Sequence, residues 1–419
     1  MAVKPGYKQT EVGVIPEDWE VCPVLQKGEV VTGKALAVNA PGALRPYLRT
    51  KNVFDGRIDI DDVLTMPMTD EQFAQFRIRN GDVLLNEGQS LELIGRCAIY
   101  QDEYPEPCAI QNALLRFRAR AGVSDKFASY LFRHCQQTGV FARIALQTTS
   151  VAHLGGSRFE RLCLAWPTEA EQLAIATALS DVDALLSALE RLIAKKCDLK
   201  KAAMQQLLTG QTRLPGFQGE WEKKTLGLVL NKGRLGGNYA NQDVEAELPL
   251  MKMGNLARGY FDLSKVQFIT PGVTPEVKHR LVFGDVLFNT RNTLDLVGKV
   301  AIWRDELPVA YYNSNLMRLE FDPEQVCSNQ YANYALNADS AISDLRGLAT
   351  GTTSVAAIYT RDLMRLQVIF PPLPEQTAIA AVLTDIDVEL AALKQRLAKT
   401  RALKQGMMQE LLTGRTRLL

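Results

Sequence analysis

Two stretches of the chain, residues 169–208 and 373–412, carry apolar side chains at alternating spacings of four and three. The series are Ile175, Leu179, Val182, Leu186, Leu189 and Ile193, then Ile379, Leu383, Ile386, Leu390, Leu393 and Leu397. This spacing is typical of a helix with one apolar seam that packs against another helix. Pro374 suits a first helical turn, and Gly210 and Gly414 suit the helix ends. Each stretch therefore predicts a helix of about 40 residues, roughly 60 Å long.

The remaining segments show a different pattern, with short apolar runs broken by Gly, Pro, Asn and Asp. GDVLLN at residues 81–86 and QVIFPPL at 367–373 indicate strands that end in turns. DKFASYLFRHCQQ at 125–137 and NQYANYALNADSAISDL at 329–345 indicate helices. These segments are therefore predicted to form mixed domains, and the fold class is α+β.

The chain contains a long internal repeat. A shift of 204 positions aligns residues 167–214 with 371–418 without a gap, with 25 identities in 48 positions. Upstream, GDVLLN pairs with GDVLFN at 284–289, and TTSVAHL at 148–154 pairs with TTSVAAI at 352–358. We expect two pseudo-twofold-related heads and two spacer helices. Their ranges are 1–160 and 215–365 for the heads, and 161–214 and 366–419 for the spacers.

The two ends of the chain also resemble the middle. Pro16, Trp19 and Glu20 near the start match the segment 215–222, where Trp221 follows the first LLTGQTRL phrase, and the chain ends on LLTGRTRLL. Because the second phrase should be followed by the same segment as the first, residues 1–20 are predicted to lie close to the C-terminus.

Charge along the two predicted helices indicates how they pair. Acidic residues dominate 169–190 and basic residues dominate 191–208, and the second helix repeats this polarity. Antiparallel pairing sets acid beside base, whereas parallel pairing sets like charges together. The pattern predicts an antiparallel coiled coil. Its seam changes phase near Lys196 and Lys200, and at Thr400 and Lys404 by the repeat, and polar residues there are expected to fix the register. Two separate amphipathic helices, each packed on its own domain, remain the alternative.

Composition narrows the classes of function. A formal net charge of +1, with 47% hydrophobic and 23% charged residues, describes a globular protein without an overall basic coat. Three histidines and seven scattered cysteines without a CxxC pair make a zinc site improbable. The start lacks the apolar core of a signal peptide, and no run of 18 apolar residues occurs. We therefore expect a cytoplasmic protein with no membrane contact.

Three stretches resemble catalytic motifs, but none of them supports a catalytic function. GEVVTGKA at 28–35 nearly fits a phosphate-binding loop, but Ala35 has no hydroxyl for magnesium. Asp82 and Glu87 could be nuclease carboxylates, yet a turn before a buried strand explains this stretch better. The Pro-Pro of adenine methyltransferases follows an Asn or Asp, whereas here Phe370 precedes it, and no GxG occurs. The sequence indicates a non-catalytic scaffold with two similar heads.

Three quoted features resemble one known family. They are YKQTEVGVIPEDWEV at 7–21, the PxxxEQ openings at 167–172 and 371–376, and the paired LLTGQTRL and LLTGRTRL. Over its full length the chain is similar to the specificity subunit of type I restriction-modification systems. The resemblance implies two target recognition domains, each reading one half of a split, asymmetric double-stranded DNA site, and two helices acting as a ruler between them.

The resemblance also implies partners. Two methylation subunits would methylate adenine, and restriction subunits would cut DNA after translocation. No cofactor is expected in this chain, because the methyl donor, ATP and magnesium would be held by those partner subunits.

Candidate DNA contacts lie in loops that follow the matched GDVL strands. The loops, at 86–93 and 289–296, are rich in side chains that hydrogen-bond base edges. The base-reading candidates are Asn86, Gln89 and Ser90 in the first head and Asn289, Arg291 and Asn292 in the second. The phosphate candidates are Arg49, Lys51 and Lys252. An ordinary surface turn is the alternative for each.

The TTSV segments, Thr148 to Val151 and Thr352 to Val355, occur in both heads and are therefore poorer candidates for base reading. They could instead bind DNA phosphate or contact the methylation subunit. Two other functions stay open at this point: a self-contained DNA methyltransferase or nuclease, and an assembly scaffold whose heads bind only protein.

Overall fold

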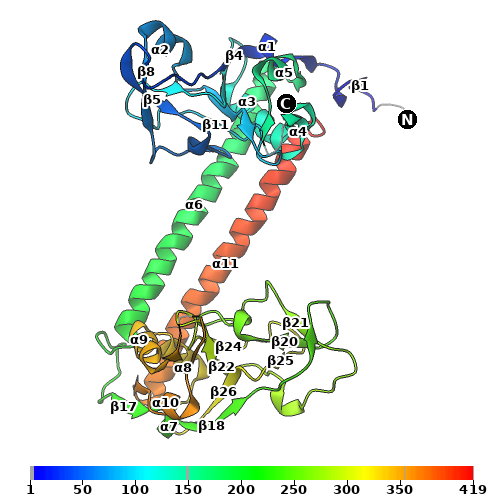
Figure 1. The fold of residues 1–419 in the computed structure, drawn as a ribbon. Coiled ribbons are helices and arrows are strands. Elements are labelled where there is room, and N and C mark those ends of the chain that lie inside the picture. Colours follow the sequence, from blue (N-terminus) through cyan, green and yellow to red (C-terminus); the bar gives the residue numbers. More distant parts are fainter. Residues whose placement is uncertain (1–3, 148–150, 353, 419) are drawn as a thin grey trace. The chain divides into compact units, whose positions relative to one another are not determined.

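The computed structural model describes residues 4–147, 151–352 and 354–418 and divides into two compact units (Figure 1). The first unit is Met1–Glu190 with Arg396–Leu419, and the second is Arg191–Gln395. Helices α6 (Glu169–Leu207) and α11 (Leu373–Leu411), each of 39 residues, contribute to both units. These bounds confirm the two long helices that the seam pattern predicts.

The first unit mixes strands with shorter helices, in agreement with the mixed fold expected from the sequence. Its helices are α1 (Val24–Lys27), α2 (Asp70–Phe76), α3 (Asp125–Gln137), α4 (Val140–Ile144) and α5 (Gly156–Arg161). Its strands are β1 (Tyr7–Thr10), β2 (Gly13–Pro16), β3 (Glu20–Pro23), β4 (Gly28–Thr32), β5 (Ala43–Leu48), β6 (Val53–Phe54), β7 (Arg57–Ile58), β8 (Leu64–Met68), β9 (Val83–Asn86), β10 (Gly88–Gln89), β11 (Cys97–Ile99), β12 (Ala109–Ile110), β13 (Leu114–Ala119), β14 (Leu146–Gln147), β15 (Ala152–His153) and β16 (Cys163–Trp166).

The second unit repeats this plan. Its helices are α7 (Leu226–Val229), α8 (Asn329–Leu336), α9 (Asp339–Leu348) and α10 (Thr360–Leu363). Its strands are β17 (Glu222–Thr225), β18 (Leu230–Leu235), β19 (Asn241–Gln242), β20 (Pro249–Met251), β21 (Gln267–Ile269), β22 (Val286–Asn289), β23 (Arg291–Asn292), β24 (Val300–Ile302), β25 (Tyr311–Tyr312), β26 (Leu316–Phe321), β27 (Thr350–Gly351), β28 (Ala356–Ala357) and β29 (Gln367–Phe370). The segment 329–345, expected as one helix, is divided because Asn337 leaves the helix and its side chain donates to the Val300 carbonyl oxygen.

A four-stranded antiparallel sheet forms the centre of each head, in the order β11-β9-β13-β4 in the first and β18-β26-β22-β24 in the second. β9 is buried on both faces: Val83 and Leu85 face the core that contains α3, and Leu84 faces the core built on β5 and β8. β22 repeats this arrangement. A strand covered on both faces needs a continuous apolar run, and this explains the sequence VLL after the turn at Gly81, where φ is +89°.

The ends of the long helices belong to the cores of the heads. Ile175 and Leu179 of α6, with Met408 and Leu411 of α11, lie in the first unit's core. Ile379 and Leu383 of α11, with Leu207 of α6, lie in the second unit's core. Burying a large apolar side chain contributes about 1.5–3 kcal/mol, so these contacts stabilise each head on its helix segments.

Within each unit, segments of α6 and α11 run in opposite directions. In the first unit Lys404 contacts Asp183 at 2.5 Å, and Arg401 contacts Glu190 at 2.6 Å. Later residues of α6 thus meet earlier residues of α11 in the first unit. The second unit shows the same order, with Lys200 contacting Asp387 at 2.6 Å and Lys196 contacting Glu389 at 2.7 Å.

Helix α6 is, by length and composition only, apolar enough to cross a membrane. A single helix of this kind is weak evidence for a membrane span, because the core helix of a soluble protein can have the same length and composition. Its residues Ile175, Leu179 and Leu189 are buried within the protein, and Asp183 accepts hydrogen bonds from Tyr130 and Lys404.

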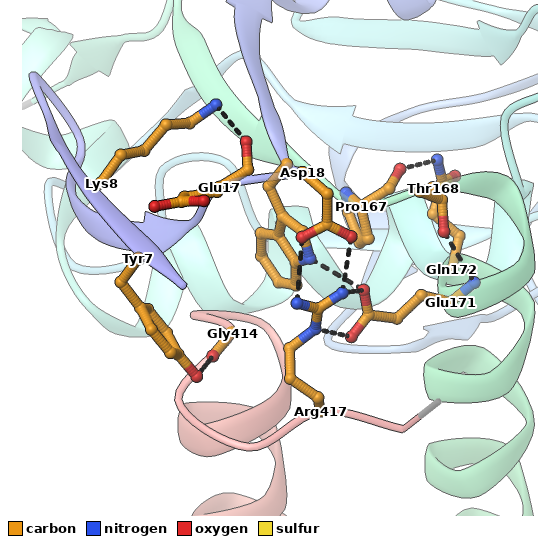
Figure 2. Close-up of polar contacts among 11 residues, drawn as sticks. Tyr7, Lys8, Glu17, Asp18, Pro167, Thr168, Glu171, Gln172, Gly414 and Arg417 are labelled. Atoms are coloured by element: carbon orange, nitrogen blue, oxygen red, sulfur yellow. Dashed lines mark hydrogen bonds and ion pairs between the residues drawn. The ribbon is translucent and has the colours of Figure 1, made fainter. Parts of the chain in front are cut away.

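A buried carboxylate joins the start of α6 to both ends of the chain (Figure 2). The guanidinium of Arg417 donates to both oxygens of Glu171 at 2.6 and 2.8 Å and to Asp18 at 2.7 and 3.0 Å. The indole of Trp19 donates to Glu171 at 2.8 Å. The Tyr7 hydroxyl donates to the Gly414 carbonyl oxygen at 3.0 Å. The expected proximity of residues 1–20 to the C-terminus is therefore confirmed for the described part of this segment, through Tyr7, Asp18 and Trp19.

The second unit contains the same arrangement in mid-chain. Arg213 donates to both oxygens of Glu375 at 2.6 Å, and the Trp221 indole donates to Glu375 at 3.1 Å. The arginine of each LLTGxTR phrase thus holds the glutamate of the other repeat's PxxxEQ opening. We call Arg417 with Glu171, and Arg213 with Glu375, the carboxylate locks.

Replacing Arg417 with alanine should lower the free energy of unfolding of the first unit by about 3 kcal/mol. The Glu171 side chain is 0% exposed and would keep only the Trp19 indole as a partner. Urea unfolding of the whole chain, followed by tryptophan fluorescence, measures the change.

Arg401→Ala is the matched control, since its contact with Glu190 is exposed on both sides and should contribute less than about 1 kcal/mol. Equal losses in the two variants would contradict the importance of the buried carboxylate.

Candidate nucleic-acid interface

Each head places a polar loop at the end of its buried central strand. After β9 the chain forms β10, which pairs with β15, and after β22 it forms β23, which pairs with β28. Two small sheets result, in the orders β10-β15-β14 and β23-β28-β27. Both heads therefore bring the predicted base-reading loop beside the segment that follows the shared TTSV sequence.

Part of the TTSV segments cannot be placed. Thr148, Thr149, Ser150 and Thr353 lie outside the described residues. In the second head Thr352 lies in the turn between β27 and β28, and its hydroxyl accepts a hydrogen bond from the Val355 backbone at 3.3 Å.

Asn86 and Asn289, both base-reading candidates, lie in the interior with 0% exposure. The amide of Asn86 donates to the Val53 carbonyl oxygen at 3.2 Å, while its own oxygen has no partner among the described residues. The amide oxygen of Asn289 accepts from the Arg291 backbone at 3.2 Å, and its nitrogen donates to the Leu296 carbonyl oxygen at 3.4 Å. Asn289 therefore holds its own loop from within, whereas Asn86 joins β9 to β6.

The other four base-reading candidates reach the surface. Ser90 and Arg291 are exposed, and Gln89 and Asn292 are half-buried. Asn292 accepts a hydrogen bond from the Thr293 backbone at 2.8 Å. Among the described residues, no side-chain partner is found for the Arg291 guanidinium. It is therefore available to an acceptor from outside the chain.

Arg49 and Lys51 are held by one carboxylate. The Asp62 side chain accepts from Arg49 at 2.6 Å and from Lys51 at 2.8 Å. The hydrogen bond from Lys51, followed by the charge of Arg49, lowers the pKa of Asp62. The cations are thus partly neutralised inside the first head.

Lys252 occupies the place of Arg49 in the second head, and its ammonium has only neutral partners among the described residues. It donates to Gln267 at 2.7 Å and to Asn241 at 3.2 Å. The aligned segments also differ in net charge: residues 49–62 carry three basic and four acidic side chains, whereas 252–265 carry three basic and one acidic. The second head therefore offers the more positive surface to phosphate.

Two buried asparagines that the sequence reasoning missed shape these segments. Asn52 accepts from the Arg49 backbone and donates to the carbonyl oxygens of Asp59 and Asp62. Asn255 makes the same contacts with Lys252, Asp262 and Lys265. The signal was present, because an asparagine stands three residues after each cation in both repeats.

The carboxylates considered for nuclease chemistry have structural partners. Asp82 is 1% exposed and accepts two hydrogen bonds from the Arg118 guanidinium at 2.7 Å and one from the Arg79 backbone. Asp285, its counterpart, contacts Arg318 at 3.0 Å, and burial raises the pKa of Asp285. Glu87 lies 3.3 Å from the Nδ1 atom of His153. Within the described ranges, no group of three or more His, Cys, Asp or Glu could hold a metal ion.

The sequence of this chain is similar to those of known proteins. Residues 218–400 match the family described as type I restriction modification DNA specificity domain. A Methanocaldococcus jannaschii protein assigned as the MjaX specificity subunit of a type I restriction enzyme is 26% identical, over 99% of this chain and 97% of its own length. The MjaVIII specificity subunit from the same organism is 23% identical, over 99% and 96%.

A solved structure agrees with the fold. The type I restriction-modification S subunit from M. genitalium covers 98% of each chain with a TM-score of 0.56 and 15% identity. Residues 218–400 thus match the type I restriction modification DNA specificity domain, and the chain is similar over 99% of its length to type I restriction enzyme specificity subunits.

Proposed function

We propose that this chain is the DNA sequence-specificity subunit of a type I restriction-modification complex. The observation that carries the proposal is a shared framework with unlike side chains at one place. In both heads a buried asparagine ends the central strand, and it bonds Val53 of β6 in the first head and its own loop in the second. The loop that follows presents Gln89 and Ser90 in the first head but Arg291 and Asn292 in the second. Two readers of unequal half-sites need this combination.

The chemistry of the exposed side chains suits base edges. Gln and Asn can form two hydrogen bonds with adenine, and Arg can form two with guanine, each pair contributing roughly 1–3 kcal/mol of discrimination. We assign base reading to Gln89, Ser90, Arg291 and Asn292. Asn86 and Asn289 were base-reading candidates as well, and their burial supports a structural role instead, between β9 and β6 for Asn86 and within its loop for Asn289.

Phosphate contacts are assigned to Arg49, Lys51 and Lys252, and Lys252 has the stronger support because its partners are uncharged. The TTSV segments, common to both heads, are assigned to phosphate or to a methylation subunit rather than to base reading. Contacts of this kind position a protein on DNA without carrying sequence information.

We further propose that α6 and α11 form an antiparallel coiled coil and that the heads are related by a pseudo-twofold axis. The head and spacer ranges remain 1–160, 161–214, 215–365 and 366–419. Opposite helix directions in each unit, the half-buried seam and the two matching carboxylate locks support this arrangement. A coiled coil of this kind would fix the number of base pairs between the half-sites.

The partners follow from the same proposal. Two methylation subunits would supply the methyl donor and modify adenine, and restriction subunits would use ATP and magnesium to translocate and cut DNA. This chain would need no cofactor of its own and would act in the cytoplasm.

The direct test mixes the purified chain with the methylation subunit, labelled methyl donor and a DNA pool, and then maps the methylated adenines. We expect one split motif with two unlike halves and a fixed spacer. The chain alone should transfer no label. Transfer by the chain alone would support a self-contained methyltransferase, and unselective binding by the complex would support a protein-only scaffold.

Substitution of the exposed loop residues should change one half-site at a time. In Arg291→Ala/Asn292→Ala, methylation should fall at least about tenfold at cognate sites, since roughly 1–3 kcal/mol is lost per bidentate contact. The sequence preference should relax only in the second half-site, and Gln89→Ala/Ser90→Ala should relax only the first.

Methylation maps of the wild-type complex and of the two double variants give the base preference in each half-site. Arg365→Ala is the control and should leave both halves unchanged. Arg365 is an exposed arginine of the second head whose guanidinium, within the described ranges, pairs only with Asp362 at 3.9 Å. Relaxation of the wrong half-site would refute the assignment of the loops.

Insertion of seven residues into each long helix should lengthen the spacer. One heptad preserves the phase of the apolar seam and adds about 10 Å, which corresponds to about three base pairs along DNA. Methylation mapping should find the same half-sites at the longer spacing. An unchanged spacer would refute the proposal that the long helices set the spacer length.

A further inference from the structure

A three-residue contact, which we call the junction clamp, recurs where each head meets the long helices. In the first unit the Tyr130 hydroxyl donates to Asp183 at 2.7 Å, and Lys404 donates to the same carboxylate at 2.5 Å. In the second unit Tyr334 donates to Asp387 at 2.7 Å, and Lys200 contacts Asp387 at 2.6 Å.

Each clamp connects three separate elements. Tyr130 comes from the head helix α3, Asp183 from α6 and Lys404 from α11. In the second unit the tyrosine comes from α8, the aspartate from α11 and the lysine from α6. The residues of the two clamps are related by the same shift of 204 positions, so the lysine of one repeat serves the aspartate of the other.

The clamps differ from the other ion pairs of the helices because they include the head. Arg401 with Glu190 and Lys196 with Glu389 join only α6 to α11, and their side chains are more exposed. Lys404 is 8% exposed, and its ammonium lies 5.4 Å from the centre of the Tyr130 ring. Lys200 lies 5.6 Å from the Tyr334 ring. Each lysine therefore touches both partners of its clamp.

Direct apolar packing is interrupted beside the first clamp. A cavity of about 1040 Å³ is lined there by residues of α3, α6 and α11, among them Lys126, Ser187 and Gln405. Apolar burial is non-directional, whereas a hydrogen bond from a phenol to a carboxylate requires a narrow range of distances and angles. The clamp therefore restricts rotation of the head helix on the helix pair more than the apolar contacts do.

The two clamps are not identical. Arg133 extends the first clamp, because its guanidinium contacts Asp55 of the head at 2.7 Å and lies 4.0 Å from Asp183. Asn337 stands at the matching position in the second unit and instead donates to the Val300 carbonyl oxygen. Among the described residues, the first clamp thus includes one more charged contact than the second.

We propose that the junction clamps set the angle at which each head is held on the helix pair, and thereby limit the spacer lengths at which both half-sites are engaged. Tyr130 and Tyr334 act as positioning residues, not as DNA contacts. This inference rests on the proposed function, since it concerns the selection of spacer length by a specificity subunit.

The test uses the full complex of this chain with its methylation subunit. DNA substrates carry the mapped half-sites with the natural spacer or with spacers one base pair shorter or longer. Tyr130→Phe removes only the hydroxyl, and Tyr334→Phe is the matched change in the second unit. Lys404→Met tests the first clamp from the side of α11. Glu190→Gln, which weakens an exposed helix contact without involving a head, is the control.

Each tyrosine variant should raise methylation of the altered spacers, relative to the natural one, by about tenfold, the factor that corresponds to about 1.4 kcal/mol. Half-site bases should stay unchanged, and Glu190→Gln should keep the wild-type spacer preference. Lys404→Met should shift the preference in the same direction as Tyr130→Phe.

An unchanged spacer preference in both tyrosine variants would overturn the inference. This holds even if the melting temperature of the variants falls, because the clamp would then only stabilise the fold. Failure of the proposed function has a different outcome, because the wild-type complex would then methylate no split site at all.

Discussion

Two buried carboxylates, Glu171 and Glu375, are the points on which the arrangement of this protein depends. Each stands in the first turn of a long helix with its side chain 0% exposed, and each is neutralised by an arginine from the end of the other long helix or the turn after it. A buried carboxylate without a partner is costly, so the arginine and the adjacent tryptophan indole are required together. Contacts with Glu171 thereby join the N-terminal segment, the C-terminal segment and the start of α6. Contacts with Glu375 join the segment after α6 to the start of α11 in the second unit.

The locks also explain the repeated phrase in the sequence. LLTGxTR ends a long helix at a glycine with positive φ, and its arginine turns back to the PxxxEQ opening of the other repeat. At Gly414 an added Cβ would lie 2.5 Å from Pro16, so the close approach of the N-terminal segment requires glycine there. The phrase and the opening therefore function as one contact that is made twice, once across the chain ends and once in mid-chain.

The heads combine a constant frame with variable surfaces. Buried strands, internal asparagines and the junction clamps are repeated almost residue for residue, whereas the loop side chains and the charge around Arg49 and Lys252 differ. Such a division suits a protein that reads two unlike sequences with one mechanical design. Asp62, by neutralising Arg49 and Lys51, makes the first head electrostatically weaker at this position than the second.

The elements whose signal is periodic or repeated follow from the amino-acid sequence alone: the long helices, the buried GDVL strands, the internal duplication and the proximity of the chain ends. Pattern reasoning succeeds there because burial of one helix face forces a regular spacing of apolar residues, and burial of both strand faces forces a continuous apolar run. A duplicated sequence also repeats its contacts. It did not separate α8 from α9, and it grouped Asn86 and Asn289 with the base-reading candidates, because an asparagine before a loop has the same signature whether its amide points outward or inward. The direction of these amides becomes visible in the folded chain alone, as does the pairing of Arg49 and Lys51 with Asp62 and of Tyr130 with Asp183 and Lys404. These contacts join residues that are distant in sequence, and their geometry depends on how the strands and helices pack around them.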